Sequence, residues 1–279
     1  MIKSISYWSF DGGLAGTLPL RDAMKQAKKA GYEGIELAFG ATGVLSPDTT
    51  EAQCRQALAD AKAIGIKLPS LCTGMYWDFS LTDDKASVRR KAHDLTVAYI
   101  QAAKMLKIKD ILVVPGAVDV FFKPDFKKVQ YDVVWKRSVA QLRKLAKVAK
   151  KAGVTICVEN VWNKFLLSPV EMQTFLKAVG SSAVGVYFDV GNIMLYGFPQ
   201  QWIRILGRKI RRIHFKDFDG SVGTVAGFCD LLKGDVPFAE VMKALREVGY
   251  KGSCTAEMVP PTPGVVKRTS KAMDRIFRM

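Results

Sequence analysis

The feature that most constrains the fold is a short sequence pattern that recurs along the chain. A segment of helical character, with Lys or Arg near its end, meets a glycine, and a short apolar run follows. The pattern is clearest at Gly31, Gly65, Gly153, Gly180 and Gly249. Glycine suits the left-handed position that follows a helix, and cations suit the negative end of the helix dipole. Each repeat therefore predicts a helix that ends just before a strand.

Strands and helices alternate eight times in this pattern. We predict strands near 3–8, 33–38, 67–72, 110–115, 154–159, 184–189, 210–215 and 253–258. We predict helices near 18–30, 49–64, 85–107, 126–152, 169–179, 199–206, 237–248 and 265–277. Short, mostly apolar strands between helices indicate a parallel sheet covered by helices. Eight units in 279 residues favour a closed barrel over an open sheet, so we expect an α/β protein with one (β/α)8 TIM barrel over residues 1–279.

Composition limits the class of protein. No apolar run approaches the roughly 20 residues that a membrane-spanning helix needs. The first residues have no signal-peptide pattern, and the five cysteines include no C-x-x-C pair. We therefore expect a cytoplasmic protein with reduced thiols and no membrane partner. The net charge of +16 has three readings, namely solvated lysine faces on outer helices, an anionic substrate or nucleic acid, and charge alone does not choose among them.

Polar side chains close four successive predicted strands. They are Glu159, Asp189, His214 and Glu257. In a barrel of this type the chemistry collects at the C-terminal ends of the strands. A single carboxylate there is usually a cap or an ion-pair partner, but three held close together would repel unless one took a proton. A divalent metal ion removes that conflict, and this donor set favours Mn²⁺ or Mg²⁺, with Co²⁺ or Zn²⁺ as alternatives.

The motifs around these residues resemble a known family. Val158-Glu159-Asn160, Phe188-Asp189-Val190-Gly191-Asn192, His214-Phe215-Lys216-Asp217 and Ala256-Glu257 are similar to motifs of the xylose-isomerase-like barrels. More narrowly, they resemble the sugar phosphate isomerase/epimerase branch, with its ketose 3-epimerases and L-xylulose-5-phosphate 3-epimerases. The loop Gly234-Asp235-Val236-Pro237-Phe238 is similar to a Gly-(Asp/Glu)-x-x-Phe loop of that branch.

The resemblance implies a function and a site. Glu159, Asp189, His214 and Glu257 would bind the metal, and Glu159 and Glu257 would also be the catalytic acid/base pair on opposite faces of the substrate. The implied activity is isomerisation or epimerisation of a sugar or sugar phosphate. Such an enzyme removes a proton beside a carbonyl to give a metal-stabilised enediolate and returns a proton to the other face or the neighbouring carbon.

Several residues on the same rim are candidates for substrate binding. Lys216 lies two residues after His214, so strand alternation points both side chains the same way. Asn192 stands where ketose 3-epimerases that act on free sugars usually have a histidine, a form more similar to the sugar phosphate branch. The remaining candidates are Asn163, Lys164, Glu36 and Trp162. Their ordinary alternatives are loop solvation for Asn163 and Lys164, a salt bridge for Glu36, and packing for Trp162.

Other functions fit parts of the pattern. A metal-dependent lyase or dehydratase acting on a keto-sugar or related polyol would use the same enolising site, and product mass separates it from an isomerase. A carbohydrate-binding barrel without activity would be expected to lose one of the four ligands, and this chain keeps them all. An endonuclease acting on abasic DNA needs several histidines, and the chain has two. The expected partner is therefore a small sugar or sugar phosphate and no nucleic acid, in a homodimer or homotetramer as is common in the family.

Overall fold

In the computed structural model, which describes residues 1–279, the first strand pairs with both the second and the last, and this closes the sheet. The strands of the barrel, all parallel, are β1 (Ile2–Ser6), β2 (Gly34–Ala38), β3 (Leu71–Cys72), β4 (Asp110–Val113), β5 (Thr155–Glu159), β6 (Val184–Asp189), β7 (Ile210–Phe215) and β10 (Ser253–Ala256). The predicted fold class, the (β/α)8 barrel, is confirmed.

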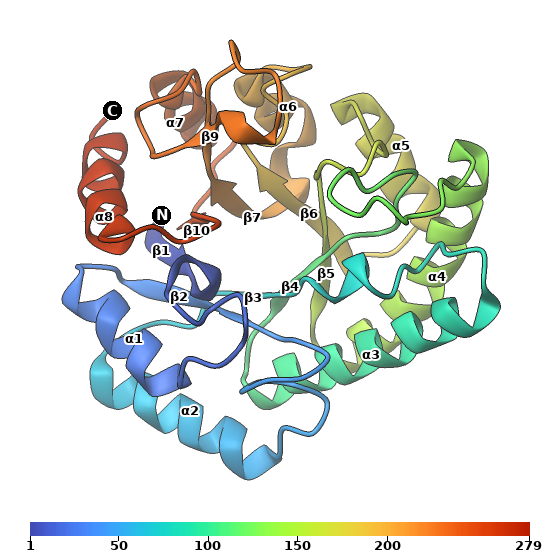
Figure 1. Cartoon of the computed structure of the whole chain (residues 1–279), viewed down its shortest axis with the longest axis horizontal. Coiled ribbons are helices and arrows are strands. Elements are labelled where there is room, and N and C mark those ends of the chain that lie inside the picture. Colours follow the sequence, from blue (N-terminus) through green and yellow to red (C-terminus); the bar gives the residue numbers. More distant parts are fainter.

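Helices surround the barrel as an outer ring (Figure 1). They are α1 (Leu20–Lys29), α2 (Glu51–Ile64), α3 (Ala86–Met105), α4 (Tyr131–Ala152), α5 (Pro169–Val179), α6 (Pro199–Leu206), α7 (Phe238–Glu247) and α8 (Val265–Ile276). Gly65, Gly153 and Gly180 occupy left-handed positions at the ends of α2, α4 and α5, as the recurring glycine pattern predicts. None of these helices is both long and apolar enough to cross a membrane.

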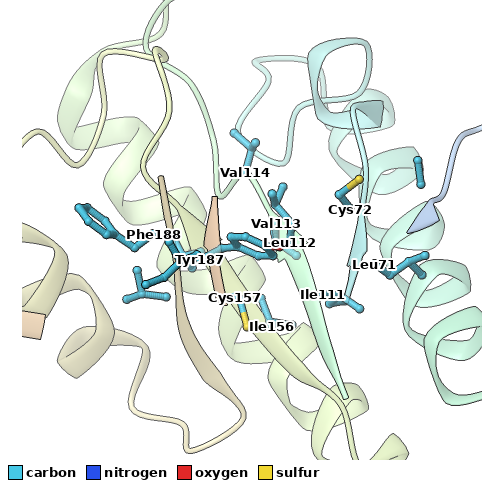
Figure 2. Close-up of a cluster of buried hydrophobic side chains, with 14 of the residues drawn as sticks. Leu71, Cys72, Ile111, Leu112, Val113, Val114, Ile156, Cys157, Tyr187 and Phe188 are labelled. Carbon is cyan, nitrogen blue, oxygen red and sulfur yellow. The ribbon is translucent and has the colours of Figure 1, made fainter. Parts of the chain in front are cut away.

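The interior of the barrel wall is apolar and closely packed. Figure 2 shows side chains of neighbouring strands gathered in one cluster, among them Leu71, Ile111, Ile156 and Phe188, and each of these is fully buried. Parallel strands covered by helices are buried on both faces, which explains their nearly continuous apolar runs. This packing holds the strand ends rigidly, so polar residues at those ends have fixed positions.

Three details differ from the predicted elements. Helix α4 begins at Tyr131 rather than near residue 126. Strand β3 begins at Leu71 rather than near residue 67, because Pro69 has no N–H to donate and Lys67 forms only an isolated bridge to Gly34. A small antiparallel pair, β8 (Asp217–Phe218) and β9 (Phe228–Cys229), was not predicted. The Asp217 carboxylate accepts the N–H groups of Phe218 and Val236 at 2.9 and 3.1 Å, which anchors the long connection between β7 and α7 beside the barrel opening.

Candidate active site

The four predicted ligands meet at the C-terminal rim of the barrel. Glu159, Asp189 and His214 lie on β5, β6 and β7, and Glu257 immediately follows β10. These strands are hydrogen-bonded neighbours, so their ends lie side by side. Each residue offers one ligand atom, and these atoms all lie within 4.8 Å of one another. All four side chains are buried.

The donor atoms converge around Nδ1 of His214. This nitrogen lies 3.0 Å from Oε2 of Glu257, 3.5 Å from Oε1 of Glu159 and 4.0 Å from Oδ2 of Asp189. Of these atoms, Nδ1 of His214, Oδ2 of Asp189 and Oε2 of Glu257 are buried without a hydrogen-bond partner. Buried polar atoms normally have partners, and the nearest cation to the two carboxylate oxygens is the Lys216 ammonium, so their convergence fits a site that binds positive charge. Three carboxylate oxygens and one imidazole nitrogen suit a divalent metal ion.

Backbone and amide contacts set the direction of the Asp189 carboxylate. Its Oδ1 accepts the N–H groups of Gly191 and Asn192 at 2.8 and 3.0 Å, so only Oδ2 is left for the cluster. The side chain of Asn160 accepts the Asp189 N–H at 2.9 Å and donates to the Asp189 carbonyl at 2.8 Å. Asn160 therefore ties the end of β5 to the end of β6, which explains the Glu-Asn pair in the sequence.

Glu36 lies behind His214, on the side of the ring away from the cleft, and not where it could contact a substrate. Its Oε1 is 2.8 Å from Nε2 of His214, and its Oε2 accepts hydrogen bonds from Ser70 Oγ at 2.7 Å and from the Tyr187 hydroxyl. Glu36 is fully buried and does not line the cleft. The structure thus replaces the expected contact with substrate hydroxyls by a contact with the imidazole. A carboxylate in this position orients a metal-binding histidine and selects its free nitrogen.

Lys216 places its ammonium group among the carboxylates, as strand alternation from His214 predicts. Its Nζ lies 2.8 Å from Oε2 of Glu257 and 3.1 Å from Oδ2 of Asp189. Burial opposes the charged form, but these carboxylates outweigh it and raise the pKa of Lys216 above its ordinary value. The ammonium therefore stays charged, and it approaches the same oxygens that a metal ion would use.

The two glutamates have pKa values shifted in opposite directions. Burial raises the pKa of Glu159 to about 7. Burial also acts on Glu257, but the positive charges of Lys216 and His214 outweigh it and hold its pKa below the usual range. For His214 itself, burial opposes protonation, and the carboxylates of Glu36 and Glu257 outweigh it and raise the pKa well above its ordinary value. In the metal-free protein Glu159 is thus the glutamate that keeps its proton at higher pH, and Glu257 is ionised.

A cleft of about 1000 Å³ opens above this cluster. Glu159, Glu257 and Lys216 form part of its floor, and most of its lining is apolar. Trp8, Trp77 and Trp162 all line it, and Trp162 is among the predicted substrate contacts. The cluster is therefore accessible to a ligand while its polar atoms remain largely shielded from bulk water.

The structure places the other candidate substrate contacts differently. Asn192 lines the cleft, and its Oδ1 lies 3.4 Å from Nζ of Lys216. Asn163 and Lys164 do not line the cleft. Asn163 is buried, and its amide donates to the Gly116 carbonyl at 2.7 Å. This hydrogen bond holds the loop after β5. Lys164 has a left-handed backbone (φ 53°), and its exposed side chain pairs with Asp119 at 2.8 Å.

Some residues that shape the site carry no strong signal in the sequence. Ser70 and Tyr187 support Glu36, yet each reads as an ordinary strand residue. Phe121 and Phe122 line the cleft from the loop after β4. A pair of adjacent aromatic residues in a loop rich in charged residues is a signal that could have identified these two.

Known proteins resemble this chain over nearly its whole length. The family model described as xylose isomerase-like TIM barrel matches residues 24–276. Fructoselysine 3-epimerase from Escherichia coli O157:H7 is 24% identical over 251 residues, covering 87% of this chain and 86% of the relative. L-ribulose-5-phosphate 3-epimerase from Escherichia coli SMS-3-5 is 23% identical over 240 residues, covering 85% and 81%. The solved structure of D-psicose 3-epimerase with D-tagatose, from Clostridium cellulolyticum H10, has a TM-score of 0.80 at 21% identity, covering 100% of this chain and 98% of that one.

Proposed function

Because this chain belongs to the xylose isomerase-like TIM barrel family, we propose that it is a divalent-metal-dependent epimerase of a sugar or sugar phosphate. The observation that carries the proposal is the buried cluster of Glu159, Asp189, His214 and Glu257, whose donor atoms all lie within 4.8 Å of one another. The 3-epimerase names of the relatives support inversion at a carbon next to a carbonyl.

These four residues would hold the metal, and Mn²⁺ or Mg²⁺ suits the donor set best. A bound divalent cation would polarise the substrate carbonyl and so acidify the neighbouring C–H. Asp189 and His214 would serve mainly as ligands, because backbone N–H groups hold one Asp189 oxygen and Glu36 holds Nε2 of His214. The two glutamates would remain the groups able to exchange a proton with carbon.

Glu159 and Glu257 come from β5 and β10, which the barrel separates by β6 and β7. A substrate bound over the cluster would therefore have one glutamate on each side. One carboxylate takes the proton from carbon, and the other returns a proton to the opposite face, which inverts the centre. Either glutamate can take the proton as a carboxylate while the other, in its protonated form, donates, and the roles exchange in the reverse direction.

Lys216 and Asn192 would bind substrate oxygens beside this pair. Both line the cleft, and the Lys216 ammonium stays charged. A cation next to the reacting carbon stabilises negative charge that develops on the carbonyl oxygen as the C–H bond breaks. Trp162 lines the same cleft and would pack against a sugar face.

The decisive experiment is solvent exchange. The Mn²⁺-loaded protein is incubated in D₂O with a panel of ketoses and ketose phosphates, and deuterium at the carbon next to the carbonyl is followed by NMR and mass spectrometry. We expect exchange that Glu159→Gln or Glu257→Gln reduces by about 10²-fold or more. Glu240→Gln, on the outer surface of α7 and half exposed, is the matched control and should not change it.

The products separate the alternatives. Conserved mass with an inverted centre supports the epimerase, and loss of water supports a lyase on the same site. Tight Mn²⁺ binding without exchange on any ketose would contradict the proposed function.

A further inference from the structure

The cleft is larger than the proposed reaction needs. Its volume of about 1000 Å³ is at the upper end of the roughly 300–1,000 Å³ that sites for drug-sized ligands occupy. A single sugar placed at Glu159 and Glu257 fills only the floor of such a space. The remaining volume is therefore open to another part of the ligand or to another molecule.

An aromatic wall lines this remaining volume. It consists of Trp77, Phe122, Phe121, Trp162 and Phe228, which all line the cleft. Successive rings lie edge to face or tilted, with centroids 5.3, 5.1, 5.8 and 5.3 Å apart. These residues come from the connections after β3, β4 and β5 and from strand β9, so four separate segments converge to build one surface.

The outer part of the wall is exposed in a way that the fold does not require. Phe121 and Phe122 are 47% and 48% exposed. Leu14, Val225 and Val259 are also exposed large apolar residues, and they line the same cleft. Apolar side chains gathered around one cavity, rather than scattered singly, mark a site for an apolar ligand group.

Positive charge is nearly absent from this cleft although the chain carries +16. Lys216 is the one cationic residue in the lining, and Glu257 and Asp189 already pair with it. Of the basic residues near the opening, Lys123 pairs with Asp78, and Arg268 pairs with Asp230 at 3.0 Å. Much of the excess charge lies on the exposed outer face of α4, at Lys136, Arg143, Lys144, Lys147, Lys150 and Lys151.

This charge distribution disfavours a phosphate. Phosphate sites normally use Arg or Lys side chains that are free to pair with the anion. Here a bound divalent cation and Lys216 would bring three positive charges against four carboxylates: Glu159, Asp217 and Glu257 line the cleft, and Asp189 belongs to the ligand cluster. No positive excess remains for a dianion. The Asp-Val-Gly-Asn motif ending in Asn192, which is similar to the sugar phosphate branch, therefore does not by itself indicate a phosphorylated substrate.

We propose that the substrate is an uncharged sugar ketone bearing an apolar ring substituent, with the sugar at the metal cluster and the substituent against the aromatic wall. A keto-glycoside and a ketose substituted at its end share this chemistry. The inference rests on the proposed function for the sugar part. The aromatic wall supports the apolar substituent, and the scarcity of free cationic side chains in the lining supports an uncharged substrate. A second copy of this chain inserting a loop into the cleft is the competing occupant.

Binding of inert probes tests this inference independently of turnover. The Mn²⁺-loaded protein is titrated by calorimetry with phenyl β-D-glucoside, methyl β-D-glucoside, D-fructose and D-fructose 6-phosphate. We expect the phenyl glucoside to bind about tenfold tighter than the methyl glucoside, since stacking on the wall adds to burial of the ring. D-fructose 6-phosphate should bind no tighter than D-fructose.

Variants of the wall locate the effect. The double variant Phe121→Ala/Phe122→Ala removes two exposed rings from a loop and should abolish the phenyl preference while leaving methyl glucoside binding unchanged. Phe198→Ala, which removes an aromatic ring that is 59% exposed outside the cleft, is the control. A phenyl preference that survives the double variant would overturn the assignment to this wall.

The failures of the two proposals are distinguishable. Tighter binding of the phosphate, or no phenyl preference, would overturn the substrate inference, and deuterium exchange on ordinary ketoses would still support the epimerase. A phenyl preference without exchange on any sugar ketone would contradict the proposed epimerase function but would still support the proposed binding site for an apolar substituent. If the double variant also lowers the oligomeric state in solution and the phenyl group adds nothing, the wall is an interface between copies, which overturns the inference.

Discussion

The Glu36 carboxylate lies 2.8 Å from Nε2 of His214. The other nitrogen of the ring, Nδ1, faces the cluster of carboxylates and lies 3.0 Å from Oε2 of Glu257. These residues are far apart in the chain, on β2 and β7, and the barrel brings them together across its interior. Ser70 and Tyr187 donate to the other Glu36 oxygen, so three side chains fix the orientation of one ring. The nitrogen left free is the one that faces the other candidate ligands.

Replacing Glu36 by Gln should weaken metal binding without abolishing the fold. The amide keeps the shape but loses the charge that supports the imidazole, and changes of this kind typically cost about 10–100-fold in metal affinity. Calorimetric titration with Mn²⁺ measures the effect, with Glu240→Gln as the control. Unchanged affinity in Glu36→Gln would contradict the role of Glu36 as a positioning residue for the metal site.

Replacing Lys216 by Met should have opposite effects on the two states of the protein. The ammonium contacts Oε2 of Glu257 and Oδ2 of Asp189, which are also candidate metal ligands. Its removal leaves buried carboxylates unpaired, and we expect the metal-free protein to lose about 3 kcal/mol of stability. Mn²⁺ should bind more tightly because a competing cation is gone. Denaturant unfolding in EDTA and calorimetry test both, and weaker Mn²⁺ binding would show that Lys216 assists the metal instead.

The metal-free protein should lose stability as pH rises from about 5 to 7. Burial raises the pKa of Glu159 to about 7, so in this window the folded state holds a proton that the unfolded state has lost. The raised pKa of His214 acts in the same direction once pH exceeds the ordinary value of 6.5. Glu257, whose pKa is lowered, is ionised in the folded state throughout, so it contributes only a small opposing slope near pH 5, where the unfolded state is still partly protonated.

Thermal unfolding in EDTA between pH 5 and pH 8 measures this dependence. Glu159→Gln should flatten the curve between pH 5 and pH 6.5. Added Mn²⁺ should stabilise more strongly at higher pH, because metal binding requires that its ligands release protons. A wild-type curve that rises through the window and coincides with that of Glu159→Gln would contradict the proton assignment.

Replacing Gly191 by Ala should disturb the site although the residue binds nothing itself. A Cβ at this position would lie 2.7 Å from Cβ of Lys216 and 3.2 Å from its carbonyl carbon and oxygen. The chain must therefore shift next to the Gly191 N–H that holds Asp189. We expect about tenfold or greater loss of Mn²⁺ affinity, by the same reasoning as for other supports of metal ligands. Gly74→Ala, where an added Cβ meets no atom closer than 3.6 Å, is the control and should keep full affinity.

Most of the architecture follows from local patterns. Helix ends marked by glycine and buried strands marked by apolar runs are properties of a few adjacent residues, so the predicted and observed elements agree closely. The departures have tertiary or chain-specific causes. Pro69 shortens β3 by lacking a donor. The connection that contains the β8–β9 pair is anchored by Asp217, whose carboxylate accepts the N–H of the adjacent Phe218 and that of the more distant Val236.

The candidate ligands were predictable for a topological reason. In a parallel barrel every strand ends on the same rim, so a polar residue closing a strand reaches the same opening as its neighbours. Glu36 satisfies the same rule and yet lies behind His214, and Lys164 follows β5 and yet pairs with Asp119 outside the cleft. Side-chain direction at a loop or deep in a strand depends on packing, which spacing does not record.

The sequence by itself therefore determined the barrel, the rim and the four residues that meet there, because periodicity and strand order are encoded locally and repeat along the chain. Only the tertiary structure decided which nitrogen of His214 faces the cluster and where Lys216 places its charge. It also decided that aromatic residues from three loops and strand β9 form one wall beside the cluster. Those relationships join residues that are distant in the chain, and their geometry is set when the barrel closes and its side chains pack.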